Sequence, residues 1–171
     1  IEAGNLRRRP VLEAREADIV LVAGQPATRM WTYNGQLPGP RIEAHVGDTV
    51  RVRFTNLLPE ATTIHWHGLR ISDQMDGSPM IQAPVLPGES FTYDFVVRDA
   101  SLYWYHPHVM SAAQVGYGLY GPLLVEDPAD GVGVADTTTI VLSDIGFDGK
   151  GVLEDAESGG SAGMVFGREG S

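Results

Sequence analysis

The chain has 171 residues, a formal net charge of −10 and a sequence pI near 4.8, and it contains no cysteine. This length suits one well-packed domain and part of a second, while the acidic balance argues against nucleic acid or an anionic membrane as a partner. Disulfides are excluded, and no apolar run approaches the roughly 20 residues that a membrane-spanning helix needs.

The secondary structure of the first 22 residues is ambiguous from sequence. Residues 1–10 are expected to form an extended, solvated arm. Residues 11–22 have a first half that suits a helix and a second half that suits a strand. Because Gly24 and Pro26 turn the chain soon afterwards, a strand is favoured.

From residue 29 onward the pattern indicates β-structure. In the stretch 49–56, Val50, Val52 and Phe54 alternate with arginines and should point inward. Further strands are expected at residues 30–34, 41–46, 62–67, 90–97, 102–105 and 119–126, with a long functional loop at 68–88 and a helical turn within 110–117. Short strands separated by turn residues predict an all-β Greek-key sandwich or barrel.

The end of the chain has a different composition. Residues 1–127 are assigned to the first domain, 128–136 to a linker, and 137–171 to the truncated start of a second domain. The sequence T-T-T-I-V-L-S-D at 137–144 predicts a strand that the first domain does not need, whereas residues 145–171 are Gly-rich and acidic, with little to build a core.

Two histidine motifs carry the chemistry of this chain. Residues 63–68 read T-I-H-W-H-G and residues 102–108 read L-Y-W-Y-H-P-H. Side chains alternate along a strand, so His65 and His67 should share one face, as should His106 and His108. The Cα atoms of each pair would be about 6.5 Å apart, which allows both imidazoles to serve one metal or two adjacent metals.

One H-x-H pair alone is more often two polar residues on a solvated strand. Here, four of the five histidines of the chain lie in two such pairs, each flanked by Trp or Tyr. If the two strands are neighbours, four imidazoles converge on one patch. Imidazole suits copper, zinc, nickel and iron, so the ligand type alone leaves the metal open.

The motifs H-W-H-G and W-Y-H-P-H resemble the copper-ligand motifs in the first domain of multicopper oxidases, the family of laccases, cuprous oxidases and bilirubin oxidases. The resemblance covers residues 30–127 and extends to five further motifs. These are Y-N-G-Q-L-P-G-P (33–40), V-G-D-T-V-R-V-R-F-T-N (46–56), M-D-G-S-P (75–79), P-G-E-S-F-T-Y (87–93) and G-L-Y-G-P-L-L-V-E-D (118–127).

This resemblance implies a cupredoxin-like barrel, with residues 137–144 as the opening strand of a second cupredoxin domain. It implies that His65 binds the type 2 copper of a trinuclear cluster, and that His67, His106 and His108 bind the type 3 pair. The implied activity is one-electron oxidation of phenols, aromatic amines or metal ions, coupled to reduction of dioxygen to water. The family position of Asp76 suggests a proton relay, although a turn aspartate before glycine is an equally good interpretation.

The family builds the other half of the cluster, and a type 1 copper with a Cys ligand, on a later domain. This chain has neither the Cys nor the further histidine motifs, so it is expected to be inactive without the rest of its polypeptide as a cleaved or separate chain. The resemblance implies secretion or a periplasmic location, and leaves a homo-oligomer open. The alternative is a copper-binding or copper-resistance protein without oxidase turnover.

The remaining candidates have simpler interpretations. His45 is expected to be a surface or structural residue. Trp66, Trp104 and Tyr105 are expected in the core or in the wall of the cluster. The methionines at 75, 80 and 110 do not form a run, which favours loop packing over copper handling.

Overall fold

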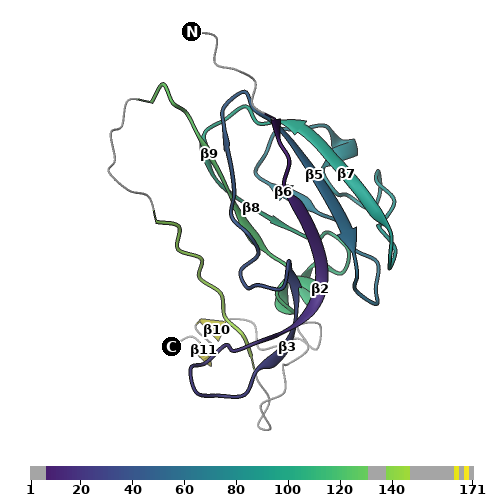
Figure 1. Ribbon diagram of the computed structural model, residues 1–171, viewed down its shortest axis with the longest axis vertical. Helices are drawn as coiled ribbons and strands as arrows, with labels where there is room; N and C mark the ends of the chain where they lie inside the picture. The colour runs from purple at the N-terminus through teal and green to yellow at the C-terminus, as the bar shows by residue number, and fades with distance from the viewer. Residues whose placement is uncertain (1–6, 131–137, 147–163, 166–167, 170–171) are drawn as a thin grey trace.

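The computed structural model describes residues 7–130, 138–146, 164–165 and 168–169, and most of its regular structure is β-strand. Figure 1 shows β2, β5 and β7 on one side of the molecule and β8 and β9 on the other. The two sheets pack face to face over a shared core, in which Trp66 of one sheet contacts Tyr93 of the other at a ring-centroid distance of 5.5 Å. This arrangement confirms the expected all-β, cupredoxin-like sandwich.

The larger sheet is centred on β5. It contains β1 (Arg7–Arg8), β2 (Val11–Ile19), β3 (Thr28–Tyr33), β5 (Thr49–Asn56) and β7 (Ser90–Val96). Strand β7 pairs with one edge of β5, while β1 and β2 run parallel to its other edge, and β3 pairs with β2. Residues 7–8 of the expected extended arm are indeed extended, and in addition their backbone pairs with β5. Residues 1–6 of that arm lie outside the described residues.

The smaller sheet carries both histidine motifs. Its strands are β4 (Ile42–His45), β6 (His65–His67), β8 (Ser101–His106) and β9 (Gly121–Glu126), in the order β4-β9-β8-β6. From β3 to β8, every connection crosses from one sheet to the other. This path places β6 beside β8, although the whole of β7 lies between them in the sequence.

The alternation of β5 explains why the sheets stack. Val50, Val52 and Phe54 have 0% exposed surface, whereas Arg51 and Arg53 are exposed. A fully buried side chain of this kind contributes about 1.5–3 kcal/mol relative to an exposed one. The inward direction expected for the three apolar residues is confirmed.

Two short helical elements complete the described domain. The 3-10 helix η1 (Asp73–Met75) lies within the long loop after β6, and α1 (Ser111–Gly116) follows the second histidine motif. The helical turn expected within residues 110–117 is thus present. Within the described residues, no helix has the length and apolar character needed to cross a bilayer.

The prediction of a strand at residues 137–144 is wrong for the described part of that range, because residues 138–146 form no strand. A strand forms through hydrogen bonds to a neighbouring strand, and no described strand pairs with this segment. Instead, residues 139–144 line an apolar groove together with Leu102, Trp104 and Pro122. Farther along, β10 (Met164–Val165) pairs with β11 (Arg168–Glu169). Whether residues 137–171 begin a second domain stays a prediction.

Candidate metal centre

The two histidine motifs lie on neighbouring antiparallel strands. Strand β6 pairs with β8 so that His65 is opposite His106 and His67 is opposite Trp104. Directly opposed residues of an antiparallel pair point to the same face of the sheet. Trp66 points to the other face and is completely buried. The expected convergence of the motifs is therefore present.

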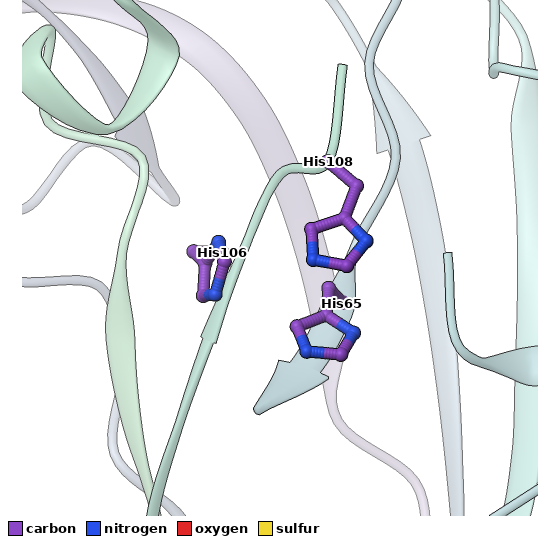
Figure 2. Close-up of side chains that lie close together, drawn as sticks. All are labelled: His65, His106 and His108. Atoms are coloured by element: carbon purple, nitrogen blue, oxygen red, sulfur yellow. The ribbon is translucent and has the colours of Figure 1, made fainter. Parts of the chain in front are cut away.

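Three of the four histidines form a tight group. One ring nitrogen from each of His65, His106 and His108 lies within 4.8 Å of the others (Figure 2). The rings of His65 and His108 are stacked, with centroids 3.8 Å apart and planes inclined by 16°. His67 stands beside this group, with its Nδ1 atom 3.4 Å from Nε2 of His106. Both motifs thus contribute to one cluster.

Backbone carbonyls orient two of these rings. His65 donates a hydrogen bond from Nδ1 to the carbonyl oxygen of Asp76 over 3.0 Å, and His106 donates one from Nδ1 to the carbonyl of Pro107 over 2.9 Å. Each bond places the ring proton on Nδ1 and leaves Nε2 unprotonated, with a lone pair that a metal can take. Metal-ligating histidines are usually held in this way. Sequence reasoning missed both acceptors, because every residue has a backbone carbonyl and no residue type signals its use.

Burial lowers the pKa of two of the imidazoles and so favours the neutral form that binds metals. His106 is 5% exposed, and burial lowers its pKa to about 4, with the neighbouring histidines adding to the effect. Burial likewise lowers the pKa of His108 below its usual value. Neutral imidazoles offer lone pairs at neutral pH, and clustered imidazole nitrogens are suitable ligands for copper. The donor set therefore fits copper.

Asp76 lies directly against His65. Its carboxylate Oδ1 atom is 3.0 Å from Nδ1 of His65, but the single proton on that nitrogen is already donated to the Asp76 backbone. The Oδ1 atom is consequently buried without a hydrogen bond of its own. Next to it, Gly77 has φ +72°, and a Cβ atom there would lie 2.1 Å from the carbonyl oxygen of Ile64. This close backbone approach is what brings Asp76 to the cluster.

Aromatic side chains form one wall of the site. Trp104 stacks on His106 with ring centroids 3.9 Å apart, and it is 38% exposed, so it covers the cluster from outside the core. Trp66 and Tyr105 are fully buried between the sheets. Both kinds of position agree with the expectation of core or cluster-wall residues.

The other candidate residues lie apart from the cluster. His45 ends β4, at the opposite edge of the smaller sheet from β6, and its Nδ1 atom lies 3.7 Å from Asp48. Met75 accepts a hydrogen bond at its sulfur from the backbone of Asp94, and Met80 is 92% exposed. His45 thus fits the expected surface or structural role and Met75 packs in its loop, whereas the packing expected for Met80 is wrong, because its side chain is exposed.

The fold and the histidine cluster together define a cupredoxin-like protein with a candidate histidine metal site, and comparisons with known proteins identify its family. The multicopper oxidase family model matches residues 15–130. The chain is 42% identical over 128 residues to multicopper oxidase MmcO of Mycobacterium tuberculosis, covering 75% of this chain and 25% of that protein. It is also 42% identical over 123 residues to copper resistance protein A of Pseudomonas syringae pv. tomato, covering 68% of this chain and 20% of that protein.

A solved structure gives the same result. The crystal structure of a multicopper oxidase from Pseudomonas thermotolerans matches with a TM-score of 0.74 and 39% identity, covering 90% of this chain and 37% of that one. The chain belongs to the multicopper oxidase family. It spans only a fifth to a quarter of the length of the two curated relatives.

Proposed function

We propose that this chain is the N-terminal part of a laccase-like multicopper oxidase. The whole protein would oxidise phenols, aromatic amines or metal ions one electron at a time, and would reduce dioxygen to water. The observation that carries this proposal is the convergence of four imidazoles, three from the paired strands β6 and β8 and one from just beyond β8, with three of them having ring nitrogens within 4.8 Å of one another. Polar residues on a solvated strand would not be expected to converge in this way.

The histidines would hold half of a trinuclear copper cluster. In this proposal His65 binds the type 2 copper, whereas His67, His106 and His108 bind the type 3 pair. Reduction of one dioxygen to two waters takes four electrons and four protons, and copper ions supply the one-electron chemistry that this needs. The neutral state of His106 and its fixed ring orientation favour ligation without prior loss of a proton.

Asp76 would handle protons beside the cluster. Water formation consumes protons, and the buried Oδ1 atom of Asp76 has a free acceptor position next to His65. A carboxylate so placed can accept a proton and pass it on. Trp104, stacked on His106, would limit the access of water to that ring.

The remaining copper ligands would come from the rest of the same polypeptide. The chain contains no cysteine for a type 1 copper site, and the curated relatives are four to five times as long as their matched part. We therefore expect the isolated chain to be inactive. Export to the periplasm or the cell exterior belongs to this proposal, and a homo-oligomer is compatible with it.

A second candidate function is copper binding without oxidase turnover. The similarity to copper resistance protein A favours it. The histidine cluster would serve either function, because both require imidazole ligands for copper.

The two functions differ in copper number and in oxygen consumption. Native mass spectrometry of the intact protein that contains this chain, followed by oxygen-uptake assays with a phenol, tests both. About four coppers per protein and oxygen uptake support the oxidase. Bound copper without oxygen uptake, with phenols, aromatic amines and Cu(I) all tried, would support the binding protein, and a protein that takes up no copper would contradict both functions.

A further inference from the structure

We infer that Thr63 is a positioning residue for His108, an inference that rests on the proposed copper-binding function. The argument begins where the strand ends. Strand β8 stops at His106, and Pro107 has no backbone N–H with which to continue the ladder. His108 therefore lies beyond the part of β8 that β6 holds in register, although its ring belongs to the tight group of three.

Thr63 provides the next contact beyond the end of the β6–β8 ladder. Because His65 is opposite His106, the same antiparallel register continued by two residues would place Thr63 opposite His108. The Thr63 hydroxyl oxygen accepts a hydrogen bond from the backbone N–H of His108 over 3.2 Å. Thr63 has 0% exposed surface, so water does not compete for this bond. A side chain replaces the missing backbone contact.

The residue before Thr63 makes a second attachment. The Thr62 hydroxyl donates to Oε1 of Gln114 over 2.7 Å, and Nε2 of Gln114 donates to the carbonyl of Ala61 over 3.0 Å. Thr62 and Gln114 are both completely buried. Gln114 lies in α1, directly after the second histidine motif. Residues 61–63 therefore hold the segment 108–114 near both of its ends.

This arrangement fixes the spacing between the two motifs. The segment 61–63 runs directly into His65, whose ring stacks on that of His108 at 3.8 Å. One short stretch thus sets the position of a ligand in the first motif and of a ligand in the second. Groups that orient metal ligands typically change metal affinity 10- to 100-fold when removed.

The test compares hydroxyl and methyl groups at position 63. In the intact copper-loaded protein, Thr63→Val keeps the shape of the side chain but removes the acceptor. We expect Cu(II) retention against a competing chelator to fall about tenfold or more. Thr63→Ser restores the hydroxyl and should stay within about twofold of the unaltered protein. In the copper absorption and electron paramagnetic resonance spectra, only the valine variant should change.

Thr32→Val is the matched control. Thr32 is also 0% exposed, and its hydroxyl donates to a backbone carbonyl, that of Arg15, over 2.8 Å in the larger sheet. Thr32→Val should lower the melting temperature about as much as Thr63→Val while leaving copper retention unchanged. Equal copper retention and spectra in Thr63→Val and the unaltered protein would overturn the inference.

Hydrogen exchange distinguishes a failure of this inference from a failure of the proposed function. It also tests the inference if Thr63→Val does not fold. The His108 amide of the unaltered, metal-free protein should exchange slowly, because its N–H is bonded to Thr63. Exchange as fast as in an unstructured peptide would overturn the inference. If the unaltered protein takes up no Cu(II), the proposed function fails instead, and a slowly exchanging His108 amide would still support the contact with Thr63.

Discussion

The two sheets of this molecule are built in different ways. In the larger sheet, β5 has paired strands along both edges, and its side chains alternate regularly between the core and solvent. In the smaller sheet, β6 has only three residues and, among the described strands, pairs only with β8. His65, His67 and His106 lie within this short ladder, whereas His108 lies beyond it and its backbone is held by the Thr63 side chain. Stability and metal binding should accordingly respond to different substitutions.

The largest expected effect is in the larger sheet. Phe54 is fully buried in β5 and contacts the rings of Tyr33 and Tyr93. Phe54→Ala should lower the free energy of unfolding by about 3–5 kcal/mol, because it removes buried apolar surface and leaves a cavity. Urea unfolding measures this loss. Copper bound per folded molecule should not change, and Phe91→Ala, at a half-buried position in β7, should cost less.

The next effect is expected at Gly77, where the smaller sheet meets the long loop. Gly77→Ala should cost about 1–3 kcal/mol from its positive φ alone, and more because the new Cβ would meet the Ile64 carbonyl. Gly88→Ala is the control, since Gly88 has φ +82° but nothing within 4 Å of a built Cβ. Gly77→Ala should have both the lower melting temperature and the lower copper content of the two variants. Equal losses in the two variants would show that the contact does not matter.

A smaller effect, confined to turnover, is expected at Asp76. Asp76→Asn removes the carboxylate that can take up a proton, and should slow oxygen reduction about tenfold or more. Copper content should stay intact, because the backbone carbonyl of residue 76 still holds His65. Asp73→Asn, in η1 of the same loop, is the control and should turn over normally. An unchanged rate in Asp76→Asn would remove the proton-transfer role.

The smallest effect is expected on the outer face of the larger sheet. Arg51 of β5 bonds through Nε to the carboxylate of Asp94 of β7 over 2.7 Å, at an exposed position. Pairs of this kind contribute about 0.2–1 kcal/mol and weaken with added salt. Arg51→Gln should therefore shift the unfolding midpoint only slightly. A double-mutant cycle with Asp94→Asn would isolate the pair, and a coupling well above 1 kcal/mol would contradict this view.

Patterns that repeat along one strand could be predicted from sequence. The alternation at Val50, Val52 and Phe54 and the H-x-H spacing both indicate which side chains share a face, and the family motifs indicate that the two strands meet. Contacts that depend on position alone could not be predicted. The carbonyl of Asp76 and the hydroxyl of Thr63 act on His65 and His108 only because the fold brings them within hydrogen-bond distance.

The strand prediction at 137–144 failed for a related reason. A sequence such as T-T-T-I-V-L-S-D signals a preference for β-structure, but the preference is realised only where a partner strand is available. Residues 138–146 have no such partner among the described residues. For Arg7 and Arg8 the opposite holds, because a partner was available although their sequence gave little sign of a strand.

The pairing of β6 with β8 also has a consequence for the order of folding. It joins residues about forty positions apart in the chain, and contacts between distant residues form slowly because a long loop must close first. The histidine cluster should therefore be assembled late, after local turns have formed. Copper present during synthesis would first meet separate H-x-H pairs, and complete sites would arise only in chains in which β6 and β8 have paired.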